Sequence, residues 1–201
     1  MEVGALHRPL SFDGCVAVRL DRMGSASLKE HYAKTRGQEF ADRIEQVHLV
    51  AARPPYDFID TGAFDFVFGS HVLEHMPNPG LALREWVRVT KAGGIVYSIV
   101  PDKNNEYDES REATPVDVLM AAFHGADPAV PRRQYQDALA GKGEEVVEEA
   151  WRDQADIHVY TYTPETVQDF FGRIAPEIGA KVELFFREGI SMHLVLRKEE
   201  A

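Results

Sequence analysis

The stretch that most constrains the fold lies at residues 64–101 and reads FDFVFGSHVLEHMPNPGLALREWVRVTKAGGIVYSIVP. Its apolar run at 64–69 predicts a buried strand, and Asn78-Pro79 offers an N-cap followed by a first-turn proline. We expect Gly93-Gly94 to end this helix and residues 95–100 to form another strand. Such a crossover is the unit of a parallel sheet covered by helices, so we predict an α/β fold with ligands near residues 70–75 and 101–103.

Length, charge and cysteine content limit the class of protein. The 201 residues suffice for one domain, and 44% hydrophobic and 27% charged residues are ordinary for a globular chain. A formal net charge of −11 argues against nucleic acid and against a membrane surface as partners, because both attract clustered Lys and Arg. The single Cys15 excludes an internal disulfide framework, and neither a signal peptide nor an apolar run of roughly 20 residues is present. We therefore expect a cytoplasmic protein.

The segments FDFVFGSHVLEHMPNP, LREWVRVTKAGG and VPDK together resemble the central half of a class I S-adenosylmethionine-dependent methyltransferase. The likeness is strongest to the branch whose central motif is H-V-L-E-H, followed by a P-D-K segment. It implies a three-layer Rossmann-like fold with a mostly parallel central sheet and a C-terminal antiparallel hairpin. We place the hairpin at 181–187 and 191–197 and treat residues 1–201 as a single domain.

The resemblance implies S-adenosylmethionine as cofactor and indicates which residues would hold it. Residues 1–10 (MEVGALHRPL) resemble the family's x-E-[IV]-G-A-x-x-x-P loop, in which a glycine permits a tight turn and close approach to a ligand. A second strand at 15–20 would end at an acid for the ribose hydroxyls. The expected cofactor-binding residues are Glu2, Gly4, Ala5, Leu6, His7, Asp21, Arg22, Ser70 and His71.

Two departures from the family pattern weaken this expectation. Family members carry helices before the first motif, whereas this sequence starts inside it. Many also place an acid for the adenine amino group after the third strand, here expected at 46–50, but this chain has Ala51 and Ala52. Tyr56 or Phe58 could stack on the base, although aromatic residues before a strand usually belong to the core.

Residues 71–75 (HVLEH) also satisfy the H-x-x-E-H pattern of one class of zinc peptidases. That site needs both histidines one turn apart on a helix, and here the pentad follows a strand and precedes Met76-Pro77. We therefore assign no metal. The candidate catalytic residues are instead His71, His75 and His158, because imidazole can accept a proton near neutral pH. His158 and Tyr160 lie in IHVYTYTPE, which resembles a family segment, and alternation puts them on one face.

The remaining segments predict helices and one irregular region. Capping signals and apolar spacing favour helices at 27–35, 114–124, 144–151 and 164–174. The loop at 101–111 carries charges at the family's spacing: Asp102, Lys103, Asp108 and Arg111. We interpret residues 126–156 as an insertion that forms a lid or a subunit contact.

Three functions remain open at this point. The first is methyl transfer to an oxygen or nitrogen of a small-molecule or sugar acceptor, in a biosynthetic role that the resemblance implies. The second is a non-catalytic methyltransferase-like protein that acts as a scaffold or partner subunit, with cofactor binding weakened or lost. The third keeps the fold for other chemistry. A sheet without its usual leading helices would leave apolar surface, so we expect a homodimer or a partner subunit.

Overall fold

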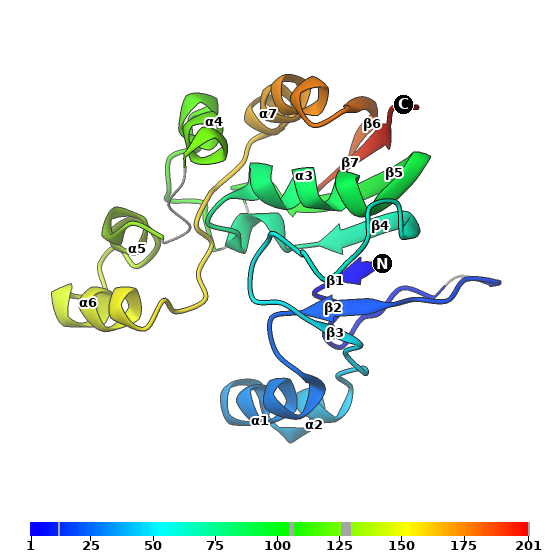
Figure 1. Ribbon diagram of the computed structural model, residues 1–201. Coiled ribbons are helices and arrows are strands. Elements are labelled where there is room, and N and C mark those ends of the chain that lie inside the picture. The colour runs from blue at the N-terminus through cyan, green and yellow to red at the C-terminus, as the bar shows by residue number, and fades with distance from the viewer. Residues whose placement is uncertain (12, 105–106, 126–129, 201) are drawn as a thin grey trace.

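The computed structural model describes residues 1–11, 13–104, 107–125 and 130–200, and these form a seven-stranded sheet with helices around it (Figure 1). The strand order is β3-β2-β1-β4-β5-β7-β6, and β7 runs antiparallel to both neighbours while the others pair in parallel. This confirms the mostly parallel Rossmann-like sheet and its C-terminal hairpin. The strands are β1 (Glu2–Val3), β2 (Arg19–Asp21), β3 (Leu49–Val50), β4 (Phe64–Ser70), β5 (Thr90–Pro101), β6 (Ala180–Glu188) and β7 (Ser191–Lys198).

The helices divide into a group that covers the sheet and a group that lies beyond its carboxyl edge. Helices α3, α4 and α7 pack together, with α3 along β4 and β5 and α7 against β6. Helices α5 and α6 lie beyond the ends to which β2 and β4 point (Figure 1). The helices are α1 (Ser25–Arg36), α2 (Gln38–Asp42), the 3-10 turn η1 (Leu73–His75), α3 (Pro79–Val89), α4 (Val116–His124), α5 (Arg132–Ala138), α6 (Glu144–Arg152) and α7 (Pro164–Glu177). No helix among the described residues is long and apolar enough to cross a membrane.

The β4–α3–β5 crossover forms the centre of the core. The Asn78 side chain accepts a hydrogen bond from the Leu81 N–H at 2.8 Å, which confirms the expected N-cap of α3. Trp86 on α3 is fully buried against β4. A Cβ atom at Gly69 would lie 2.5 Å from the Trp86 ring, so only glycine lets this helix pack so close to the strand.

The boundary between α3 and β5 differs from the prediction. The helix ends at Val89 and β5 begins at Thr90, so Gly93 and Gly94 lie within the strand and do not cap the helix. A Cβ atom at Gly94 would lie 2.6 Å from the Asp65 carbonyl oxygen. The glycine therefore serves the close approach of β5 to β4, where the pairing register shifts.

Several other predicted boundaries were also wrong. Strand β2 begins four residues later than the expected start at Cys15, and β3 keeps only the end of the segment proposed for it. Helix α1 starts at Ser25 behind the N-cap Gly24, so Ser27 lies within the helix and makes no capping box. Helix α5 was not predicted. Helix α7, in contrast, starts as expected, with Thr163 as N-cap and a capping box that uses Thr166.

Candidate active site

A cleft of about 900 Å³ opens where β1, β2 and β4 end. Such a volume is typical of sites for small molecules and cofactors, and its place fits the rule for open α/β sheets. One wall comes from the turn after β1, from Asp21 and Arg22, and from α1 and α2. The other comes from the turn after β4 and from three later segments, which contribute residues 107–111, 130–138 and 154–159.

The turn after β1 has the backbone shape of a ligand-binding loop. Gly4 has a φ of 66° and Leu6 a φ of 44°, both in the left-handed region. A Cβ atom on Gly4 would lie 2.9 Å from Cγ2 of Val72, so this turn is in close contact with the turn after β4. The backbone at Gly4 is thus exposed to the cleft without a side chain in front of it, as the resemblance implied.

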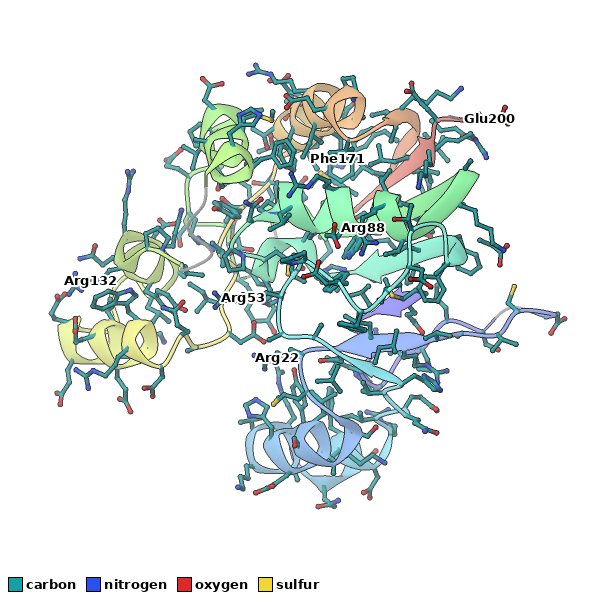
Figure 2. The ribbon with its side chains drawn as sticks, viewed as in Figure 1. Arg22, Arg53, Arg88, Arg132, Phe171 and Glu200 are labelled. Atoms are coloured by element: carbon teal, nitrogen blue, oxygen red, sulfur yellow. The ribbon has the colours of Figure 1, made fainter. Side chains whose placement is uncertain are left out.

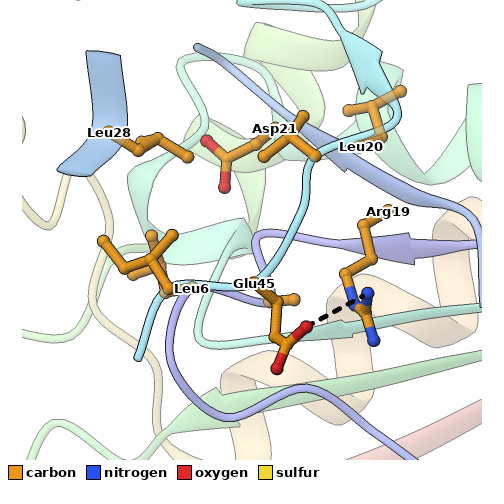
Figure 3. Close-up of a pocket in the computed structure, with 9 residues that line it drawn as sticks. Leu6, Arg19, Leu20, Asp21, Leu28 and Glu45 are labelled. Atoms are coloured by element: carbon orange, nitrogen blue, oxygen red, sulfur yellow. Dashed lines mark ion pairs between the residues drawn. The ribbon is translucent and has the colours of Figure 1, made fainter. Parts of the chain in front are cut away.

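Two of the proposed cofactor residues support the turn from behind. Glu2 is buried, and its Oε1 accepts a hydrogen bond from the Leu10 N–H at 2.8 Å. Its Oε2 lies 3.5 Å from Nε of Arg19. Ala5 lines a closed cavity of about 10 Å³, which is room for one water and lies beside Asp21 (Figure 3). Neither residue is among those that line the cleft, and Glu2 holds the loop in shape through Leu10.

Asp21 ends β2 and lies at the mouth of the cleft, as predicted. Its Oδ1 accepts a hydrogen bond from the Arg22 N–H at 2.7 Å, and burial raises the pKa of its carboxyl group. The Arg22 guanidinium reaches across the cleft to within 3.4 Å of Asp156. Arg22 and Arg53 lie between α1 and the α5–α6 pair in Figure 2.

An aromatic wall next to these residues was not predicted. The rings of His7 and Phe40 lie 4.2 Å apart, and Tyr32 lies 5.2 Å from Phe40. All three line the cleft. Tyr32 and Phe40 belong to α1 and α2, which carry no family motif, so only the apolar face of a helix could have indicated them. Of the predicted aromatics, Tyr56 is fully buried at the inner end of the cleft, and Phe58 is exposed outside it.

The three candidate catalytic histidines lie on the opposite wall, each beside a carboxylate. His71 follows β4 with a φ of 53°, and its Nδ1 lies 3.3 Å from Oε1 of Glu74. The Nδ1 of His75 lies 2.8 Å from Asp156, and the Nδ1 of His158 lies 2.6 Å from Asp108. The structure brings all three into one cleft. Ser70, expected beside them, pairs with β5 and does not line the cleft.

Electrostatics in this wall follow from its pairs. Burial alone would lower the pKa of His75, but the Asp156 and Glu74 carboxylates outweigh it, and the net result is a raised pKa. Burial would raise the pKa of Asp108, but the hydrogen bond from His158 and the Arg111 guanidinium hold it below its ordinary value. Despite burial, the His75 imidazole likewise lowers the pKa of Asp156, so Asp108 and Asp156 are ionised at neutral pH.

The charged loop after β5 divides into two parts. Asp108 and Arg111 are buried at the cleft, joined at 2.8 Å, and Arg111 also donates to Asp137 on α5. Asp102 and Lys103 lie outside the cleft lining, and Asp102 accepts from the Arg187 guanidinium at 2.8 Å. Only half of the predicted substrate loop thus reaches the site.

The described part of the insertion, 130–156, forms one side of the cleft. Tyr135 on α5 donates a hydrogen bond to the Ala155 carbonyl, and Arg132 pairs with Glu148 on α6 at 3.0 Å. Asp156 binds two cleft residues and was missed, although it adjoins the IHVY segment. Residues 126–129 of the proposed lid lie outside the described part of the chain.

The H-x-x-E-H pentad lacks the geometry of a peptidase zinc helix. Only Leu73–His75 are helical, in the 3-10 turn η1, and His71 precedes this turn in a left-handed conformation. Tyr160, expected to share the cleft-facing side of His158, donates to the Pro77 carbonyl and is almost fully buried. Its segment forms no strand and joins the sheet through only one bridge, Asp102 to Tyr162, among the described residues.

Comparisons with known proteins agree with this geometry. Residues 4–98 match a family model described as a methyltransferase domain. No curated protein matches the sequence. A SAM-dependent methyltransferase from Methanosarcina mazei is similar over 98% of this chain and 91% of that chain, with 15% identity and a TM-score of 0.56.

Two further solved structures share the fold. One, from Thermotoga maritima, is described as a SAM-dependent methyltransferase and possible histamine N-methyltransferase; it has 14% identity and a TM-score of 0.52, with 98% and 81% of the chains covered. The other, a SAM-dependent methyltransferase from Aquifex aeolicus, has 13% identity and a TM-score of 0.50, with 98% and 79% covered. At these identities the likeness establishes the arrangement of the sheet and helices.

Proposed function

We propose that this chain is a class I S-adenosylmethionine-dependent methyltransferase that methylates an oxygen or nitrogen of a small-molecule or glycan-type acceptor, because residues 4–98 match a methyltransferase-domain model and the fold is shared with solved methyltransferases. The observation that carries the proposal is the division of the cleft into two unlike walls. One wall has the glycine turn, the buried Asp21 and the aromatic rings, whereas the other has three histidines paired with carboxylates.

The first wall fits S-adenosylmethionine. The side-chain-free turn at Gly4 accepts a ligand against the backbone, and the Asp21 carboxylate can accept hydrogen bonds from two neighbouring ribose hydroxyls. His7, Tyr32 and Phe40 supply flat surfaces for an aromatic base, in place of the adenine acid that the chain lacks. When bound, the cofactor supplies an activated methyl group together with its own leaving group.

The protein then has to hold the acceptor, exclude water and take up a proton. We assign the proton to the imidazole of His71, because the turn that carries it contacts the Gly4 turn and its side chain is 44% exposed to the cleft. The buried Glu74 carboxylate beside Nδ1 stabilises the imidazolium that results. His75 and His158 then lie farther along the acceptor side, with α5 and α6 as a cover against water.

The nature of the acceptor follows from the same wall. Imidazole rings, Arg111 and carboxylates offer many hydrogen-bonding groups among apolar residues such as Met76 and Val130, and this mixture suits a polyhydroxylated or amine-bearing molecule. The proposal includes a cytoplasmic location, where the exposed Cys15 would stay reduced.

The proposal also includes a homodimer. Strand β6 is an edge strand, and Val182, Leu184 and Phe186 on it are each at least 40% exposed. A second copy could cover this row by pairing edge to edge. The comparisons give no support to a purely non-catalytic role.

The test is a methyl-transfer assay. The purified chain is incubated with S-adenosylmethionine carrying a deuterated methyl group and with panels of sugars, nucleotide sugars, phenols and amines. We expect one acceptor class to gain the mass of one labelled methyl group while S-adenosylhomocysteine accumulates in equal amount. If S-adenosylmethionine binds but label reaches none of the panels, the proposed acceptor class is wrong.

A further inference from the structure

A buried carboxylate beneath the acceptor side of the cleft has no hydrogen-bond donor among the described residues. Glu74 in η1 is fully buried, and neither of its carboxylate oxygens accepts a hydrogen bond there. The Nδ1 of His71 lies 3.3 Å from Oε1 but does not meet hydrogen-bond geometry. Burying an ionised group without such partners is costly, so this carboxylate needs an explanation.

Two imidazole rings face the same point. One ligand atom each from Glu74, His75 and His158 lie within 4.8 Å of one another, and the two rings meet edge to face with centroids 4.8 Å apart. Main-chain hydrogen bonds fasten the two segments, because the Glu74 carbonyl accepts from the Val159 N–H at 2.7 Å and from the Tyr160 N–H at 3.3 Å. The cluster is therefore built by the backbone and does not depend on long, mobile side chains.

Each ring is also backed by a second carboxylate. Asp108 lies 2.6 Å from Nδ1 of His158 and is itself held by Arg111, and Asp156 lies 2.8 Å from Nδ1 of His75. Metal-binding histidines usually give the other ring N–H to a carboxylate, which fixes the tautomer and orients the remaining nitrogen. The His158 Nδ1 is hydrogen-bonded to Asp108, so its Nε2 is the atom left for a ligand, whereas the contact between His75 Nδ1 and Asp156 is an ion-pair distance without hydrogen-bond geometry.

We propose that Glu74, His75 and His158 bind a divalent transition-metal ion, with zinc as the best match, at the floor of the acceptor side. Two imidazoles and one carboxylate, without a thiolate, suit zinc and other divalent first-row transition metals. Three protein ligands also leave coordination positions open to the cleft. Tetrahedral zinc at about 2.1 Å from each atom would require separations of about 3.4 Å, so the side chains close in by up to about 1.4 Å on binding.

The role of the ion rests on the proposed function. A bound acceptor hydroxyl would have its pKa lowered by the cation, as water does on zinc. Its proton passes to His71, its oxygen forms the bond to the methyl group, and the donor's carbon–sulfur bond breaks to leave a neutral thioether. The H-x-x-E-H pattern did not indicate these three ligands. That pattern pairs His71 with His75, whereas the second imidazole here is His158, which comes from a distant segment.

The test uses the full chain, treated with chelator and then titrated with Zn²⁺ by calorimetry and with Co²⁺ by visible absorption. We expect one ion per chain and Co²⁺ bands of a site with nitrogen ligands. Glu74→Gln and His158→Ala should each weaken binding by at least about tenfold, and Asp108→Asn by about 10- to 100-fold. His124→Ala, which removes an exposed histidine 2.8 Å from Glu177, is the matched control and should leave binding unchanged.

The inference is overturned if the folded wild type takes up no ion, or if the Glu74 and His158 variants bind as well as the wild type. In that case an imidazolium at His75 balances the buried charge. Circular dichroism shows which variants fold. If Glu74→Gln does not fold, the affinity of His158→Ala for the ion decides the question, because that substitution leaves η1 unchanged. S-adenosylmethionine is titrated separately into the metal-free chain. A chain that binds the cofactor but takes up no metal ion refutes only this inference, and a chain that binds the metal ion but no cofactor refutes only the proposed function.

Discussion

In the proposed cofactor site, the residues would act through their backbone and their burial as much as through their side chains. Gly4 contributes the absence of a side chain, and Glu2 keeps the loop in place by capping the Leu10 N–H. Asp21 is held almost fully buried at the end of β2, with its ionised form stabilised by backbone N–H groups. A ligand that donates hydrogen bonds to this carboxylate would gain strongly, because few other donors compete for it.

Replacing Asp21 with Ala should therefore weaken S-adenosylmethionine binding by more than tenfold, since two charge-assisted hydrogen bonds are lost. Calorimetric titration measures the affinity. Asp65→Ala is the control, because Asp65 is exposed at the far end of β4 and pairs only with Lys91 among the described residues. An affinity unchanged in Asp21→Ala would refute the ribose assignment.

The same carboxylate predicts a pH dependence. Burial raises the pKa of Asp21, so the group takes up a proton at a higher pH than an exposed aspartate does. Only the ionised form accepts both hydroxyl hydrogen bonds, so affinity is full above the raised pKa and falls by about tenfold per pH unit below it. Calorimetry from neutral to acidic pH measures this fall. Asp21→Asn should lose this pH dependence of the affinity. An equally steep fall in the affinity of that variant would contradict the ribose assignment.

At the scale of elements, the parts of the fold that could be predicted are those in which local signals and packing agree. Asn78-Pro79 and Thr163-Pro164 cap α3 and α7 where the sequence indicated. The prediction that Gly93-Gly94 ends the helix was wrong. A glycine pair is equally compatible with a helix end and with close strand pairing, and only the contact with β4 distinguishes the two.

The site shows the same limit. Gly4, Asp21, His71 and His75 could be placed in the cleft because they follow or end strands, where the topology itself makes a cleft, and His158 could be placed there because its segment resembles a family motif. Tyr32 and Asp156 could not, because their position depends on how α1 and the segment after α6 fold back over that edge. Such tertiary contacts leave no local pattern.

Two glycines, one in strand β4 and one in helix α7, predict stability changes of opposite sign. Gly69→Ala should lower the free energy of unfolding by about 1–3 kcal/mol, because its Cβ would overlap the buried Trp86 ring. Gly172→Ala should raise it by about 1 kcal/mol, because this exposed position in α7 has no atom within 4 Å and alanine favours the helix. Urea unfolding measures both. A stable Gly69→Ala variant would show that α3 can move away from β4.

At the scale of the whole molecule, the hairpin edge of the sheet is the feature that a lone chain explains least. Phe186 stacks on His193 with ring centroids 4.4 Å apart, and His193 in turn accepts or donates a hydrogen bond with Tyr97 at 2.7 Å. This aromatic row continues to Phe68 on β4, whose ring lies 5.2 Å from Tyr97. A row of rings across four strands is typical of a sheet face that another element covers.

We therefore expect light scattering at micromolar concentration to give the mass of a dimer, and Leu184→Asp to shift it toward the monomer by placing a charge on the edge strand. Val118→Asp is the control, because Val118 is similarly exposed but lies on α4. A clean monomer for the wild type would refute the homodimer.

The central claim is that this cleft binds S-adenosylmethionine for methyl transfer. Calorimetric titration of the folded chain with S-adenosylmethionine, and in parallel with S-adenosylhomocysteine, tests it most directly. The account predicts micromolar binding of both ligands at one site per chain, lost in Asp21→Ala. No detectable binding of either ligand by a folded sample would contradict it and would leave the family's fold serving as a scaffold.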